Sequence, residues 1–235
     1  MSSRFTKNAA VVLVHGPWLD AGMWNDVILP LRRQGLQVVA AQLPLTSFED
    51  DLAALERTLK QADGPLILVG HSYSGALIAN AALHSNTIQA LVFISAITPD
   101  RDETVADVLR QETSSEGSPR MITDRYGFIW RSEVEFRTVL APHAAAHQWA
   151  LMAATQKSMS VKCLEGRIPN TDWQKVPSSY LIAEQDHVLS AKTQRVMANR
   201  MNARTYVYPL DYAAAITEPE IVLDVILEAA HAHLS

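Results

Sequence analysis

The sequence predicts an α/β fold: a mainly parallel sheet of about six strands flanked by helices, with a helical cap inserted into it. Short apolar runs of strand type alternate along the chain with segments of helical spacing. The central runs are apolar at nearly every position, which is typical of strands covered on both faces of a sheet. The composition is globular, with 48% apolar and 19% charged residues. We expect one domain over residues 1–235, because this length supports a single core.

The alternation of strands and helices is regular in the first and last parts of the chain. The predicted strands are residues 9–14, 37–41, 66–70, 88–95, 178–183 and 204–207. The predicted helices are residues 25–34, 48–62, 192–200 and 218–230, with another that begins at Gly75. Apolar residues three or four apart indicate the helices, and Gly35 and residues 63–65 are stop signals. In a sheet of this kind, ligands bind at the carboxyl ends of the strands.

The regular alternation fails between residues 99 and 175. This part contains Ser, Gly and Pro at 113–119, an aromatic segment at 126–130, and amphipathic helical stretches at 133–141 and 143–155. An insertion between two regular strands indicates a functional loop region rather than a further layer of the sheet. We therefore expect residues 99–175 to form a cap over the ligand cleft.

The stretch 66–78 concentrates the chemistry of the chain. Its apolar run stops at Gly70, Ser72 follows two residues later, and a helical pattern begins at Gly75. A serine at the apex of a sharp strand-to-helix turn is the arrangement of a nucleophile elbow, which points the hydroxyl at a cleft. The usual pattern G-x-S-x-G has Ser74 in place of its second glycine. Serine is nearly as small, so we expect an unharmed fold; a hydroxyl that tunes the site is the alternative.

Charge and composition exclude several function classes. A formal net charge of −5 and an isoelectric point near 5.9 argue against a nucleic-acid partner. No apolar run approaches the roughly 18 residues that span a bilayer, so we expect no membrane partner and a cytoplasmic location. The single cysteine, Cys163, excludes an internal disulfide framework. We expect a small-molecule substrate or ligand and no metal or cofactor; a homodimer stays open, because dimers are the commonest assembly.

Four motifs in order give the chain a resemblance to the α/β-hydrolase superfamily. They are the strand and loop from Val11 to Trp18, the elbow from Gly70 to Gly75, the strand end from Ala183 to His187, and the segment from Asp211 to Pro219. Together they are specific, whereas a lone G-x-S-x-G is weak. The chain resembles in particular the small capped members related to plant esterases, hydroxynitrile lyases and bacterial hydrolases. The resemblance implies an α/β-hydrolase fold, with ester or acyl hydrolysis as the inherited activity.

The resemblance also implies a catalytic serine, acid and histidine in that order along the chain. Ser72 matches the nucleophile and Asp186 matches the acid, although a loop carboxylate that caps the helix near residue 190 is the alternative for Asp186. The histidine is expected seven residues before a proline, and counting back from Pro219 reaches Tyr212. A phenol has a pKa of about 10 and is a poor base at neutral pH. Loss of a triad member typically leaves about 10³–10⁴-fold catalysis over water.

The oxyanion hole departs from the family pattern as well. One donor is expected to be the backbone N–H of Tyr73, and the resemblance places the second on the residue after His15 and Gly16. That residue is Pro17, which has no N–H. Removing one such donor costs roughly 2.7–4 kcal/mol of transition-state stabilisation. The sequence therefore predicts two deficits in the same acyl-transfer site.

Three histidines are candidate substitutes for the missing base. His187 adjoins Asp186, and His143 or His147 could descend from the cap. A base must come within about 3 Å of the serine oxygen, which few histidines do. His143 and His147 are also four residues apart on a plausible helix, but no third ligand indicates zinc. We expect His15 and His71 to hold loops.

Aromatic residues near the motifs are candidates for the pocket lining. Trp18 and Tyr73 lie in the motifs themselves, and Trp130 is the candidate from the cap. Plain core packing is an equal alternative for each of them, because aromatic side chains dominate core energetics.

Two functions from different classes fit these residues. The first is an α/β-hydrolase-fold enzyme for a small apolar or aromatic molecule, with weak hydrolysis or a non-hydrolytic reaction of lyase or cyclase type. The second is a binding protein that keeps the pocket without the chemistry. A third possibility is an otherwise complete enzyme whose histidine at position 212 was replaced by Tyr212.

Overall fold

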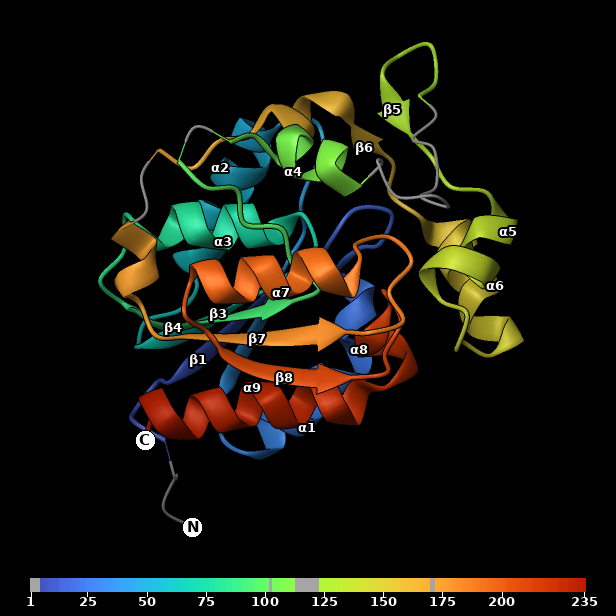
Figure 1. Cartoon of the computed structure of the whole chain (residues 1–235). Coiled ribbons are helices and arrows are strands. Elements are labelled where there is room, and N and C mark those ends of the chain that lie inside the picture. Colours follow the sequence, from blue (N-terminus) through green and yellow to red (C-terminus); the bar gives the residue numbers. More distant parts are fainter. Residues whose placement is uncertain (1–4, 102, 113–122, 170–171) are drawn as a thin grey trace.

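A computed structural model describes residues 5–101, 103–112, 123–169 and 172–235 (Figure 1). Its centre is a six-stranded parallel sheet in the order β2-β1-β3-β4-β7-β8. The strands are β1 (Ala10–Val14), β2 (Gln37–Ala41), β3 (Leu66–His71), β4 (Ile88–Ile94), β7 (Ser178–Ala183) and β8 (Arg204–Tyr208). All six predicted strands are present close to their expected bounds, which confirms the fold class.

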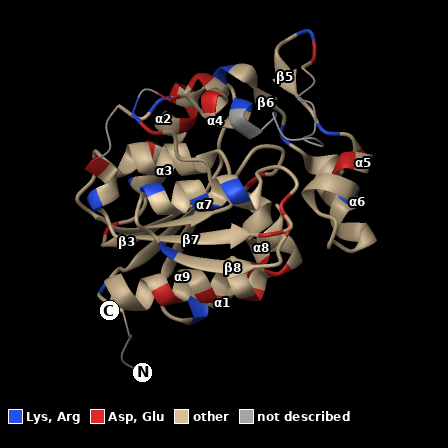
Figure 2. Cartoon of the chain, in the orientation of Figure 1, with Lys and Arg blue, Asp and Glu red and all other residues tan. Residues whose placement is uncertain are grey.

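Helices cover both faces of this sheet. Figure 1 shows α2, α3 and α7 on one face and α1 and α9 on the other. Their bounds are α1 (Asn25–Arg33), α2 (Phe48–Leu59), α3 (Ser74–Ala82), α7 (Ala191–Arg200) and α9 (Pro219–His233), with the short η1 (Ala21–Trp24) and α8 (Ala214–Thr217) beside α1 and α9. Every residue of β1 and of β3 is buried, as two covered faces require. Charged residues lie mainly on the helices and loops, and Arg204 is the one Lys, Arg, Asp or Glu within the six strands (Figure 2).

The segment between β4 and β7 contributes no strand to the six-stranded sheet in its described residues. It forms α4 (Val105–Glu112), a small antiparallel pair of β5 (Phe128–Ile129) and β6 (Met159–Ser160), α5 (Glu133–Glu135), the π-helical η2 (Phe136–Leu140), α6 (Ala146–Thr155), η3 (Val161–Glu165) and η4 (Asp172–Lys175). We call residues 99–175 the inserted segment. Its part with β5, α5 and α6 lies on the side to which β7 and β8 point (Figure 1).

Of two expectations for the inserted segment, one is corrected by the structure and the other falls on residues that the structure does not describe. The helix expected at 143–155 begins at Ala146, because His143 still contacts the loop after β8. The Ser, Gly and Pro stretch at 113–119 lies outside the described residues.

The carboxyl ends of four strands bring the predicted motifs together. β1 leads to His15–Trp18, β3 to Ser72, β7 to Asp186 and β8 to Tyr212. Because the strands are parallel, these segments meet at one edge of the sheet. Within the described part of the chain, no helix has the length and apolar character needed to cross a membrane.

Candidate active site

Ser72 occupies the apex of a strained turn between β3 and α3. Its φ is +54°, a left-handed conformation that a side chain other than glycine rarely adopts. The turn is held on both sides: the Ser72 N–H donates to the Ile94 oxygen at 3.0 Å, and the Ser72 carbonyl accepts from Gly75 at 3.0 Å and Ile97 at 2.9 Å. The residue is 3% exposed. This is the geometry of a nucleophile elbow.

The altered glycine pattern of the elbow has a packing explanation. A Cβ at Gly75 would lie 2.6 Å from the Ile97 oxygen and 2.9 Å from the Ala96 Cβ. Gly75 therefore allows α3 to pass close to the end of β4. The Ser74 hydroxyl donates to the His15 carbonyl, which ties the elbow to the loop after β1. This bond favours the view that Ser74 leaves the fold unharmed.

Tyr212 lies beside Ser72. A Cβ built on Gly16 would be 3.0 Å from the Ser72 Cβ and 3.0 Å from the Tyr212 hydroxyl oxygen, so both side chains border this glycine. The Tyr212 hydroxyl donates to the Pro17 carbonyl at 3.2 Å. Burial raises the pKa of Tyr212 well above its usual value, although contact with the Ser72 hydroxyl opposes this. The phenol therefore stays neutral and cannot take a proton from serine at neutral pH.

Asp186 is buried in the loop that follows β7. Its carboxylate accepts from the Val188 N–H at 2.7 Å, the Leu189 N–H at 3.0 Å and the Gln194 side-chain amide at 3.1 Å. Burial raises the pKa of Asp186 to about 7, while these backbone hydrogen bonds lower it. Its charge also raises the pKa of Tyr212, although no hydrogen bond joins the two among the described residues. Asp186 thus organises its own loop and acts on Tyr212 through space.

The two motif histidines hold loops. His15 accepts from the Leu43 N–H at 3.0 Å through Nε2 and donates to the Gly16 carbonyl at 2.8 Å through Nδ1. His71 donates through Nε2 to the Tyr212 carbonyl at 2.8 Å, and its ring meets the Tyr212 ring edge-on at 4.5 Å. Burial lowers the pKa of each imidazole to about 4. Both rings are therefore neutral at pH 7 and keep the loops after β1 and β8 in place.

The three candidate substitute bases lie on the surface. His187 and His147 are exposed, and His143 is exposed with its Nδ1 4.0 Å from the Asp211 carboxylate. In the part of the chain that the structure describes, no hydrogen bond joins a histidine ring to Ser72. His143 also precedes α6, so His143 and His147 do not share a helix.

The loop after β1 offers few donors for an oxyanion. Pro17 has no N–H, and the next amide, that of Trp18, donates to the Lys157 carbonyl at 3.1 Å. The Tyr73 amide lies at the start of α3, where helix geometry leaves N–H groups without intrahelical partners. One helix-end amide is thus available where an acyl-transfer site uses two donors.

The predicted aromatic residues separate in the structure. Trp18 is buried, donates from Nε1 to the Ile129 carbonyl at 3.2 Å, and packs with its ring 6.2 Å from that of Tyr212. The Tyr73 side chain instead joins a separate buried cluster, in which its hydroxyl donates to Asp51 at 2.9 Å. Trp130 is 49% exposed and donates to Asp124 at 3.1 Å, so it lies on the outer surface of the inserted segment. Trp18 is the one of the three that contacts Tyr212.

Sequence reasoning missed two buried charged residues near the elbow. Asp51 accepts from Leu45 at 2.6 Å and from the Tyr73 hydroxyl, and burial raises its pKa to about 6. Its position in an acidic first turn of α2 is fully explained by the helix dipole, so nothing marked it as buried. Arg131 lies over the Trp18 ring, with the guanidinium carbon 4.1 Å from the ring centroid. No motif pointed to Arg131.

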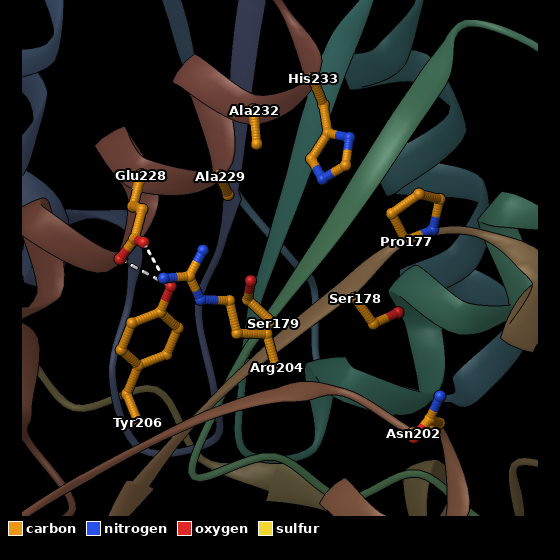
Figure 3. A pocket seen from close by; sticks show the side chains of 10 residues that line it. All are labelled: Pro177, Ser178, Ser179, Asn202, Arg204, Tyr206, Glu228, Ala229, Ala232 and His233. Atoms are coloured by element: carbon orange, nitrogen blue, oxygen red, sulfur yellow. Dashed lines mark hydrogen bonds and ion pairs between the residues drawn. The ribbon is translucent and has the colours of Figure 1, made fainter.

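A pocket of about 250 Å³ at the other end of the sheet has different chemistry (Figure 3). It lies at the starts of β7 and β8, beside the last turns of α9. Arg204 forms an ion pair with Glu228, and the Tyr206 hydroxyl donates to the same carboxylate at 2.7 Å. This pocket is separate from the Ser72 edge.

Comparison with known proteins agrees with the motifs. The sequence profile of the Alpha/beta hydrolase family matches residues 11–234. Alpha/beta hydrolase nvfD of Aspergillus novofumigatus is 20% identical, over 94% of this chain and 96% of its own. Methylesterase 8 of Arabidopsis thaliana is 25% identical, over 93% of this chain and 88% of its own.

A solved structure agrees at the level of the fold. The crystal structure of tomato Methylketone Synthase I complexed with 2-tridecanone superposes with a TM-score of 0.83 and 18% identity, and the match covers 97% of this chain and 100% of that one. Since the family profile spans nearly the whole sequence, this chain belongs to the Alpha/beta hydrolase family and resembles its plant esterases.

Proposed function

We propose that the protein binds a small apolar or aromatic molecule beneath the inserted segment, which acts as a cap. In this proposal, Ser72 and Tyr212 position the molecule or give it a proton, in a non-hydrolytic reaction of lyase or cyclase type. The observation that carries the proposal is the buried, neutral phenol of Tyr212 beside Ser72, where the family pattern has a histidine.

The Tyr212 phenol suits hydrogen-bond donation rather than proton acceptance. Its raised pKa keeps the O–H bond intact at neutral pH. The bond to the Pro17 carbonyl is long, at 3.2 Å, so a carbonyl oxygen of a ligand can replace this acceptor at little cost. Serine hydrolysis needs the opposite: a group that accepts the Ser72 proton while two donors hold the oxyanion.

The surroundings of the site support an apolar ligand. Trp18 and Tyr212 are aromatic neighbours with ring centroids 6.2 Å apart, and both are at most 4% exposed. The tomato relative was crystallised with 2-tridecanone, an apolar chain with one carbonyl group. The Arabidopsis relative is a methylesterase, so the family relation also supports a carbonyl-containing substrate.

Hydrolysis of p-nitrophenyl acetate and p-nitrophenyl hexanoate, with Ser72→Ala as the control, tests this proposal. We expect hydrolysis close to the buffer rate, far below the roughly 1–10³ s⁻¹ that is typical of enzymes. We expect both the natural protein and Ser72→Ala to bind 2-tridecanone saturably. Quenching of tryptophan fluorescence measures this binding. Rapid hydrolysis that Ser72→Ala abolishes would show that a competent base exists. Binding without conversion across a panel of carbonyl compounds would favour a binding protein.

A further inference from the structure

Arg131 is a buried cation whose environment is incomplete. Its side chain is 2% exposed, which is rare for arginine. One guanidinium nitrogen, Nη1, forms an ion pair with Glu135 at 2.9 Å. The Nε atom is buried and has no hydrogen-bond partner in the part of the chain that the structure describes. A buried N–H of a charged group is costly to leave unpaired, so an ion pair formed for stability alone does not account for this Nε.

Arg131 lies close to the Ser72 edge of the sheet. Its guanidinium carbon is 4.1 Å from the centroid of the Trp18 ring, and the same ring packs 6.2 Å from Tyr212. The positive charge acts on the phenol, since it lowers the pKa of Tyr212 against the effect of burial. Arg131 thus comes from the inserted segment, and its charge acts on the phenol beside Ser72.

The guanidinium is fixed before any ligand arrives. Glu135 holds it, and Glu135 is itself fixed because its other oxygen accepts from the Ser132 N–H at 2.8 Å and the Ser132 hydroxyl at 2.9 Å. The Gln156 side chain brackets the Arg131 main chain, accepting from its N–H at 3.0 Å and donating to its carbonyl at 2.8 Å. A guanidinium held in this way loses little conformational freedom when it binds an anion.

We propose that Arg131 recognises a carboxylate, and that the ligand of this site is a small carboxylate with an apolar body. The carboxylate accepts from the Arg131 Nε–H, and the apolar body packs against Trp18 and Tyr212. A hydrogen bond from a charged guanidinium N–H to a carboxylate is charge-assisted and stronger than one to a neutral acceptor. This inference rests on the proposed function, because it names the class of molecule that the Ser72 site takes.

Matched acid and amide probes test the proposal. We would measure binding of heptanoate and heptanamide, and of 2-naphthoate and 2-naphthamide, by calorimetry at low ionic strength. The natural protein is expected to bind each acid at least about tenfold more tightly than its amide, in line with a charge-assisted hydrogen bond. Arg131→Gln is expected to remove this preference and to bind the amides as before. Arg131→Lys keeps the charge without the Nε–H, and its preference for acids is expected to fall between those of the natural protein and Arg131→Gln.

Arg137 supplies the matched control, because it is an exposed arginine of the same inserted segment. Arg137→Gln should keep the full preference for acids. The proposal is overturned if the natural protein binds acid and amide equally, if it binds none of the acids at millimolar concentration, or if Arg131→Gln keeps the preference. The acid preference is a measurement of binding, whereas the proposal for Ser72 and Tyr212 is tested by ester hydrolysis and by conversion of carbonyl compounds. A failure of this inference is therefore distinguishable from a failure of the proposed function.

Discussion

Polar side chains are buried at the carboxyl ends of the central strands and largely exposed at the amino ends. At the carboxyl ends, Ser72, Asp186 and Tyr212 are each at most 6% exposed, and burial shifts the pKa of both Asp186 and Tyr212. At the amino ends, the Arg204 and Glu228 side chains are 63% and 41% exposed and simply pair with each other (Figure 3). The difference teaches that burial is the main cause of the raised pKa of Asp186 and Tyr212 at the carboxyl ends of the strands.

The largest expected effect comes from restoring a base at the buried end. Tyr212→His should raise hydrolysis of p-nitrophenyl acetate by about 10²–10⁴-fold, the contribution typical of a positioned general base. Tyr212→Phe keeps the ring but has no base, so it should give no gain. Steady-state kinetics at pH 8 measures the effect. If Tyr212→His gives no gain, the missing oxyanion donor at Pro17, rather than the missing base, limits hydrolysis.

Asp186 gives the next largest effect, through the pH dependence of stability. Its pKa is about 7 in the folded protein against a usual value of 3.8, so its stabilising contribution is complete at low pH and is lost as pH rises through 7. The free energy of unfolding of Asp186→Asn, relative to that of the natural protein, should therefore be about 2–3 kcal/mol higher at pH 8 than at pH 5. Urea unfolding at both pH values measures this. Asp26→Asn, at an exposed position, is the control, and an equal gain there would contradict the role of burial.

Gly16 tests how closely the buried groups are packed. A Cβ at this position would lie 2.5 Å from His71 Nδ1 as well as 3.0 Å from Ser72 and Tyr212. Gly16→Ala should cost about 1–3 kcal/mol of stability, as overpacking in a well-filled core does. Gly22→Ala is the control, because its nearest neighbour is the movable end of the Asp20 side chain. Thermal unfolding compares the two variants. Equal melting temperatures would show that the groups around Gly16 have room for a Cβ atom.

The smallest effect is expected at the exposed end. Glu228→Gln removes the ion pair with Arg204, and exposed pairs contribute at most about 1 kcal/mol. The change should shrink further in high salt, because exposed charges are screened. Urea unfolding at low and high salt measures both. If Glu228→Gln lowered the free energy of unfolding as much as Gly16→Ala does, the two ends of the sheet would not differ in this respect.

Much of the fold and of the candidate site follows from local sequence patterns. The six strands were predictable because apolar runs and their stop signals are short-range features. Ser72, Asp186 and Tyr212 were placed by motif spacing, and the structure gathers the segments that carry them at one edge of the sheet.

Contacts between the inserted segment and the core were beyond sequence reasoning. Trp130 and Arg131 are neighbours, yet the aromatic residue faces solvent and the charged one is buried against Trp18. Composition predicts the reverse, since tryptophan is usually the more buried of the two. The outcome depends on where β5 pairs with β6, which is a tertiary event. Asp51 is similar, because its partner Tyr73 is remote in sequence.

The hydrogen bond from Tyr212 to the Pro17 carbonyl has a consequence for how this site changes by mutation. It joins the two positions at which the chain departs from the hydrolytic pattern, so the departures form one physical unit. Substitutions at residues that share a contact are usually not additive. Epistasis is therefore expected between positions 17 and 212: the gain in hydrolysis from Tyr212→His should depend on which residue stands at position 17.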